Sequence, residues 1–135
     1  EKEYESIEQV YPEVTYIANY INDLKYGNKL NKKVCYSSYA EDYEKIIDQF
    51  DLVISTRVHT CGLAASLGIP NIIIPHDKRY KTGQGFKAEI YNCEEDLLSL
   101  IRKIHFRERS QELIEHRSQQ FNKYLEILSD KLSIL

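Results

Sequence analysis

The sequence contains few of the residues that mark disordered, fibrous or disulfide-rich proteins. Its 135 residues include five Gly, three Pro, three Cys, no Met and no Trp, and 42% of them are hydrophobic. Because disordered and low-complexity segments are poor in apolar residues, this composition excludes them and indicates a globular domain. A chain of this length buries roughly two-thirds of the surface that it exposes when unfolded, so we expect a real core and a single domain over residues 1–135. Since the chain begins with Glu1 and contains no Met, we also expect it to be part of a longer protein.

The small number of cysteines argues against both disulfide bonds and a metal site. Cys35, Cys61 and Cys93 are odd in number, and no Cys-x-x-Cys pair or His at metal-ligand spacing accompanies them. We therefore expect no metal ion and a reducing, cytoplasmic compartment. No apolar run approaches the roughly 20 residues of a membrane span, and no secretory signal is visible, so no transmembrane segment is expected.

The sequence also lacks an excess of positive charge. Its formal net charge is -3, whereas binding to a phosphate backbone normally requires a basic face, so we expect no nucleic-acid partner. The densest basic stretch spans residues 102–109 but is interrupted by Glu108. We interpret this stretch as the solvated surface of a junction between two helices.

Hydrophobic patterning predicts helices that alternate with strands. An amphipathic helix is predicted from Val10 to Leu24, because apolar residues recur there at helical spacing and Gly27 supplies a stop. Short runs rich in β-branched residues predict strands at 33–37, 51–55, 71–75 and 88–91. Further helices are predicted at about 39–49, 60–67, 92–104 and 108–132, with residues 76–87 as a loop.

Two of the predicted helix starts carry capping signals. Ser38 precedes Glu41, and Asn92 precedes Glu95, by the three residues at which side chains satisfy the first turn of a helix. We interpret Ser38 as a cap and not as a nucleophile, because no base accompanies it. The alternation of strands and helices predicts a Rossmann-like α/β fold, a parallel sheet with helices on both faces.

Ligands of such folds bind beyond the carboxyl ends of the strands, which selects the loops at 55–59 and 75–86. The first loop carries Ser55, Arg57 and His59 at the start of a helix, whose N–H groups and dipole favour an anion. The second loop adds Lys78 and Arg79, so cations from two adjacent strand ends are expected to converge. The sequence thus predicts a phosphate or carboxylate site.

A structural explanation of the same residues stays open at this point. Arg57 can pair with Asp51 or Asp77, and His59 can bind a backbone carbonyl at the helix start. Neither a Gly-x-Gly-x-x-Gly motif nor a Walker loop is present, so dinucleotides and P-loop nucleotides are not expected ligands.

Residues 51–86 resemble the polysaccharide pyruvyltransferase family. That family shows Ser-x-Arg-x-His after an apolar strand, a small-residue helix ending in Gly-x-Pro, then Asp-Pro-Lys and Gly-Phe. The matching residues here are Ser55-Thr-Arg57-Val-His59, Gly68-Ile-Pro70, Asp77-Lys-Arg79 and Gly85-Phe86. The likeness covers about 36 of the 135 residues and keeps the spacing of two loops, so it is more specific than Arg-x-His alone.

The resemblance implies a two-lobed fold like that of GT-B glycosyltransferases, with this chain as the C-terminal lobe and an N-terminal lobe missing. Members transfer the pyruvyl unit of phosphoenolpyruvate onto a sugar of a cell-surface polysaccharide or of its lipid-linked precursor. The implied partners are phosphoenolpyruvate as co-substrate, with no further cofactor, and a saccharide acceptor. An isolated lobe is expected to be inactive, and a lipid-linked acceptor would bring the cytoplasmic protein to the inner face of the membrane.

The family's residues carry over by position. His59 corresponds to the family's His, Arg57 to its Arg and Asp77 to its Asp, while Arg79 stands where the family has Lys. We expect His59 to act as general acid and base near neutral pH. Arg57 would hold the phosphate and carboxylate together with Arg79 or Lys78, because the departure from Asp-Pro-Lys leaves that choice open.

Two other functions stay open from the sequence. One is a GT-B-type glycosyltransferase or sugar-nucleotide-binding lobe, in which the same cations hold a diphosphate and Glu89, Glu94 or Glu95 binds the ribose hydroxyls. The other is a non-catalytic binding lobe, which the replacement of Asp-Pro-Lys by Asp-Lys-Arg favours.

Overall fold

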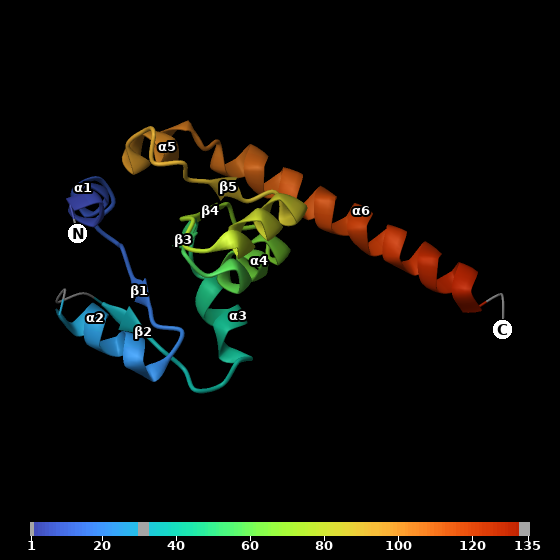
Figure 1. The fold of residues 1–135 in the computed structure, drawn as a ribbon, viewed down its shortest axis with the longest axis horizontal. Helices are drawn as coiled ribbons and strands as arrows, with labels where there is room; N and C mark the ends of the chain where they lie inside the picture. Colours follow the sequence, from blue (N-terminus) through green and yellow to red (C-terminus); the bar gives the residue numbers. More distant parts are fainter. Residues whose placement is uncertain (1, 30–32, 133–135) are drawn as a thin grey trace. The chain divides into compact units, whose positions relative to one another are not determined.

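The computed structural model describes residues 2–29 and 33–132 (Figure 1). The chain divides into two compact units, which are described separately. Unit 1 consists of Glu1–Gln49 and Cys93–Arg102, and unit 2 consists of Phe50–Asn92 and Lys103–Leu135. In the described part of the chain, no helix combines the length and the apolar character that crossing a membrane requires.

Unit 1 is built around two short parallel strands. Its elements are α1 (Lys2–Val10), β1 (Tyr16–Ile17), the 3-10 helix η1 (Ile21–Asp23), α2 (Leu24–Lys29), β2 (Val34–Cys35), α3 (Asp42–Ile47) and most of α5 (Leu97–Lys103). Tyr16 lies opposite Val34 in the parallel ladder, and Ile17 lies opposite Cys35. Helix α2 approaches this ladder so closely that a Cβ on Gly27 would lie 2.4 Å from the Val34 side chain. Glycine is therefore required there by packing.

The single helix predicted from Val10 to Leu24 is wrong. Helix α1 ends at Val10, β1 follows, and α2 begins only at Leu24. Pro12 explains the early end, because the residue before a proline is disfavoured in helical conformation. Tyr16 and Ile17 have side chains that favour strands, and pairing with β2 satisfies their backbone groups. The helical spacing of the apolar residues was coincidental.

Unit 2 contains a three-stranded parallel sheet in the order β3-β4-β5. Its elements are β3 (Val53–Ser55), α4 (Val58–Ser66), β4 (Asn71–Ile73), the 3-10 helix η2 (Lys78–Phe86), β5 (Glu89–Ile90) and α6 (Phe106–Leu132). The four predicted strands are all present, each shorter than predicted. Parallel strands in small sheets, alternating with helices, confirm the mixed α/β class and are consistent with a Rossmann-like fold.

The core of unit 2 lies between the sheet, α4 and α6. Helix α4 contacts β3, β4, η2 and α6, and in Figure 1 it lies directly beside the strands. Ile72 and Ile73 of β4, Cys61 of α4 and Leu113 of α6 are almost completely buried. Helix α4 ends as predicted at Gly68, whose φ of +77° is the left-handed conformation that favours glycine after a helix. Buried residues of β4 and of the small-residue helix α4 thus form part of this core.

The capping residues differ from those predicted. Helix α3 begins at Asp42, and the hydroxyl that supports its start belongs to Ser37, which donates to the Asp42 carboxylate at 2.6 Å. Helix α5 is capped by Asp96, whose carboxylate accepts a hydrogen bond from the Ser99 N–H at 3.0 Å. The predicted caps at Ser38 and Asn92 are wrong, because in each case a neighbour with equivalent chemistry lies closer to the helix.

Residues 76–87 are also not the irregular loop that was predicted. Most of them form η2, which begins after Asp77 and ends at Phe86. A 3-10 helix has three residues per turn, so the 3.6-residue apolar period of an α-helix is not expected in it. Gly83 lies against the core, where a Cβ would be 2.4 Å from the Ile73 side chain.

Candidate functional site

The candidate site lies at the carboxyl ends of β3 and β4. Ser55 lies opposite Ile73 in the parallel ladder, and the Ile74 N–H donates to the Ser55 carbonyl at 2.9 Å. The two strands therefore end side by side, and the segments that follow them leave from the same edge of the sheet. This placement of the two segments agrees with the sequence prediction.

The first segment forms a tight turn into α4. The Arg57 N–H donates to the Ser55 hydroxyl oxygen at 2.9 Å, which holds the turn. Arg57 has extended backbone angles (φ −96°, ψ 112°), and its carbonyl accepts from the Cys61 N–H in the first turn of α4. The side chains of Arg57 and His59 are both exposed. Guanidinium and imidazole groups are thus presented at the N-terminal end of a nine-residue helix.

The second segment is organised by Asp77. Its carboxylate accepts the Arg79 N–H at 2.8 Å and the Arg79 Nε at 2.9 Å, and it forms an ion pair with the Arg79 Nη2. These hydrogen bonds from Arg79 lower the pKa of Asp77 to about 2, so the carboxylate is ionised at neutral pH. The Arg79 guanidinium is therefore engaged locally, although 74% of its side chain is exposed.

Lys78 differs from Arg79 in its surroundings. Its side chain is exposed, and within the described residues it has no ion-pair partner. A lysine amine in this setting is a mobile point charge that can turn toward an anion at the same sheet edge.

Two pockets within the described residues lie away from the candidate site. One, of about 260 Å³, is lined by Asp51 and Pro70 at the amino ends of β3 and β4 and by the first turns of α6. The other, of about 250 Å³, lies between α4, η2 and α6 and is lined by Phe86, His116 and other residues. Neither is lined by the residues of the candidate site, whose Arg57, His59 and Lys78 side chains are exposed.

An ion-pair cluster in unit 2 was missed by the sequence analysis. The Arg109 guanidinium lies 2.7 Å from Glu112 and 3.2 Å from Glu89, and Lys87 lies 2.8 Å from Glu112. Only 16% of the Arg109 side chain is exposed, so the interpretation of residues 102–109 as solvated surface is wrong for Arg109. The i, i+3 spacing of Arg109 and Glu112 was the available signal.

The buried thiol in α4 has no candidate chemistry. Cys61 is fully buried and donates to the Ile72 carbonyl at 3.6 Å. Burial raises the pKa of the Cys61 thiol to about 12, so it stays protonated and unreactive.

Comparison with known proteins gives one match. The sequence model of the polysaccharide pyruvyl transferase family matches residues 3–78, more than half of the chain. The matched range includes Ser55, Arg57, His59 and Lys78 and stops one residue before Arg79. No curated protein and no solved structure matches the chain significantly. The chain belongs to the polysaccharide pyruvyl transferase family.

Proposed function

We propose that the candidate site binds phosphoenolpyruvate and that the protein transfers its pyruvyl group onto a sugar of a cell-surface polysaccharide or of its precursor. The family's description names transfer of a pyruvyl group to a polysaccharide. Our proposal adds phosphoenolpyruvate as the donor of that group. The observation that carries it is the exposure of Arg57 and His59 at the start of α4, beside the strand end that leads to Lys78.

The charge of the site suits this donor. Phosphoenolpyruvate carries a tetrahedral phosphate and a planar carboxylate. The oxygens of both groups accept hydrogen bonds. The Arg57 guanidinium can hold one of them through two parallel hydrogen bonds. Lys78 and the N-terminal end of α4 add positive potential on the same edge of the sheet.

His59 fits the proton transfers that forming a pyruvate ketal requires. The methylene carbon of phosphoenolpyruvate must gain a proton, which leaves an oxocarbenium-like carbon that sugar hydroxyls attack. Each attacking hydroxyl loses a proton. The phosphate leaves with the electron pair of the C–O bond that joined it to that carbon. The His59 imidazole is exposed at the start of α4, where it can reach a bound substrate, and imidazole groups can both donate and accept protons.

Ser55 and Asp77 have supporting roles in this proposal. The Ser55 hydroxyl oxygen accepts the Arg57 N–H and so fixes the turn that presents Arg57. Asp77 holds Arg79 and precedes η2, whose first residue is Lys78. Both contribute by shaping the backbone around the anion.

The proposed site is open, and a second lobe that covers it would complete the reaction centre. An N-terminal lobe of the kind found in GT-B-like proteins would exclude water from the donor site. We propose that this chain is the C-terminal lobe of a two-lobed transferase.

Replacing His59 by Gln in the full-length protein tests the proposal. We expect turnover with phosphoenolpyruvate to fall at least about 100-fold, because general acid–base catalysis contributes that much, while folding is unchanged. Phosphate release and circular dichroism measure the two effects. His105→Gln is the matched control, since His105 is exposed on the approach to α6 and its ring lies 3.7 Å from Glu108. Retention of most of the turnover by His59→Gln would refute the role of His59.

A further inference from the structure

Unit 1 presents two exposed tyrosines at the carboxyl edge of its own parallel sheet. Tyr20 follows β1 and Tyr39 follows β2, and their relative exposures are 60% and 69%. Because β1 and β2 are parallel neighbours, the segments after them leave from one edge. That edge is where ligands of parallel α/β sheets bind. These two segments, residues 18–24 and 36–42, are called the Tyr20–Tyr39 edge below.

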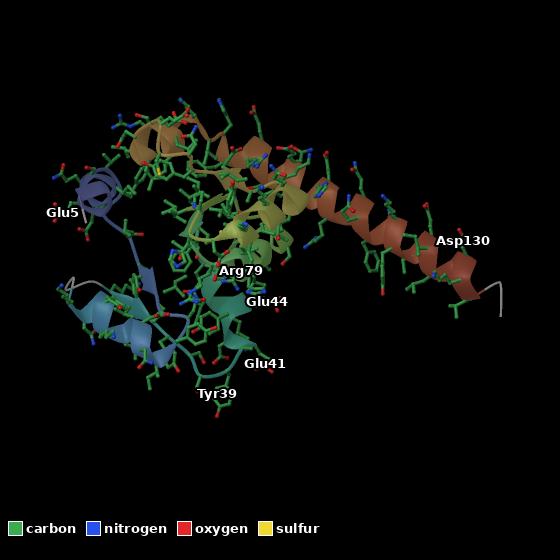
Figure 2. All side chains as sticks on the ribbon, viewed as in Figure 1. Glu5, Tyr39, Glu41, Glu44, Arg79 and Asp130 are labelled. Atoms are coloured by element: carbon green, nitrogen blue, oxygen red, sulfur yellow. The ribbon has the colours of Figure 1, made fainter. Side chains whose placement is uncertain are left out.

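Both tyrosines stand on backbone that is held in place. The Tyr20 N–H donates to the Asp23 carboxylate at 3.1 Å, and the Asp23 N–H donates back to the Tyr20 carbonyl at 2.8 Å. The Tyr39 N–H donates to the Ser37 hydroxyl oxygen at 3.1 Å, and that hydroxyl donates to Asp42 at 2.6 Å. Figure 2 shows the Tyr39 side chain standing out from the turn before α3. The rings are exposed although their turns are fixed, so little entropy is lost when a ligand covers them.

A third tyrosine joins the two turns. The Tyr43 hydroxyl donates to the Ala18 carbonyl at 2.6 Å and lies 3.2 Å from the Ser37 carbonyl. Burial raises the pKa of Tyr43, so the phenol stays protonated and keeps this bridge. Because one hydroxyl contacts both strand ends, the two turns are held at a fixed separation.

The charge of the Tyr20–Tyr39 edge is opposite to that of the donor site. Its charged residues are Asp23, Glu41 and Asp42, and residues 18–24 and 36–42 contain no Lys, Arg or His. A phosphate or carboxylate is repelled by such a surface. A neutral sugar ring suits it, because sugar hydroxyls donate to carboxylates and the apolar face of the ring packs on an aromatic side chain.

We propose that the Tyr20–Tyr39 edge binds a neutral pyranose ring of the saccharide acceptor. Tyr20 and Tyr39 supply the stacking surfaces, and Asp23 and Glu41 accept hydrogen bonds from ring hydroxyls. The inference rests on the proposed function for the identity of the acceptor, but binding of a sugar to this edge is measured without turnover.

Saturation-transfer NMR with methyl β-glucopyranoside and methyl β-galactopyranoside tests the site on the full-length protein. We expect ring-proton signals from at least one glycoside with the wild type, reduced about tenfold or more in the double variant Tyr20→Ala, Tyr39→Ala, because each stacking contact is lost. Tyr26→Ala is the matched control, since Tyr26 is a similarly exposed (53%) tyrosine on α2 and should leave the signals unchanged. Absence of signals from the wild type, or undiminished signals from the double variant, would overturn the proposal.

Kinetics separate this inference from the proposed function. In the double variant we expect the KM for the acceptor to rise about tenfold and the KM for phosphoenolpyruvate to change less than about twofold. An equal rise in both values would mean that the substitutions disturb the whole unit, and it would overturn the acceptor site. Sugar signals without any turnover of phosphoenolpyruvate would instead refute the donor assignment and leave the Tyr20–Tyr39 edge supported.

Discussion

At the residue scale, the turn between β3 and α4 determines which groups a ligand can reach. Ser55 uses its hydroxyl oxygen to accept the Arg57 N–H, so its side chain stabilises the turn. Arg57 adopts an extended conformation before the helix, and His59 lies one residue inside it. Both side chains are consequently exposed and not sealed in the core.

Lys78 and Arg79 are distinguished by their partners, which gives a prediction. Because the Asp77 carboxylate engages the Arg79 guanidinium, we expect Lys78 to be the cation that holds phosphoenolpyruvate. Lys78→Ala should raise the KM for phosphoenolpyruvate about tenfold, and Arg79→Ala only about twofold to threefold. Steady-state kinetics on the full-length protein measure both.

Lys81→Ala, on an exposed position of the same 3-10 helix, is the control for a general loss of charge. A larger effect of Arg79→Ala than of Lys78→Ala would contradict this assignment of the cation.

The residues of the candidate site could be predicted because they follow apolar strands that any folded form must bury. Ser55, Arg57 and His59 come directly after β3, and Asp77 follows β4 by four residues. The ion-pair partner of Asp77 could not be predicted, because Lys78 and Arg79 follow it in the sequence and Arg57 was a third candidate. The choice of Arg79 depends on the conformation of η2, whose formation the sequence pattern did not indicate.

At the scale of elements, the most accurately predicted parts are those whose burial is nearly complete. Residues 72–74 are three consecutive isoleucines, so a buried strand was the expected structure there. The segment from Val10 to Leu24 mixes polar and apolar residues, and both a helix and a strand are compatible with it. Tyr16 forms a strand and not a helix because it pairs with β2, and the sequence pattern does not show this long-range pairing.

The cluster of Lys87, Glu89, Arg109 and Glu112, which joins the segment after η2 to α6, predicts a pH-dependent stability. Hydrogen bonds from Lys87 and Arg109 hold the pKa of Glu112 below its ordinary value of 4.5. A carboxylate with a lowered pKa stabilises the folded state above the pKa of its unfolded form, and this contribution is lost as the pH falls through the folded pKa. The cluster therefore stabilises the protein at neutral pH and weakens below about pH 4.5.

Glu112→Gln should lower the free energy of unfolding at pH 7 by about 1 kcal/mol or less, because water screens a side chain that is 44% exposed. The difference from the wild type should shrink from pH 7 to pH 3, because the Glu112 carboxylate loses charge as protons bind to it. Urea unfolding at the two pH values measures this, with Glu115→Gln on the same helix as the control. A difference that is as large at pH 3 as at pH 7 would show that packing, not charge, is responsible.

At the scale of the whole molecule, charge is divided between the two units. The proposed donor site in unit 2 carries Arg57, Lys78 and the start of α4, whereas the Tyr20–Tyr39 edge in unit 1 carries only acidic residues. Such a division suits an anionic donor and a neutral acceptor, because the acidic edge repels the anionic donor while a neutral sugar is repelled by neither surface. The family match, which covers residues 3–78, includes both surfaces except for Arg79.

The central claim is that Arg57 and its neighbours at the β3–β4 edge form an anion site for phosphoenolpyruvate, and titration calorimetry on the full-length protein tests it most directly. We predict that the wild type binds phosphoenolpyruvate, that UDP-glucose gives no comparable heat, and that Arg57→Ala raises the Kd for phosphoenolpyruvate at least about tenfold without unfolding the protein. Binding of phosphoenolpyruvate by Arg57→Ala as tight as by the wild type, or tight binding of UDP-glucose in its place, would contradict the claim.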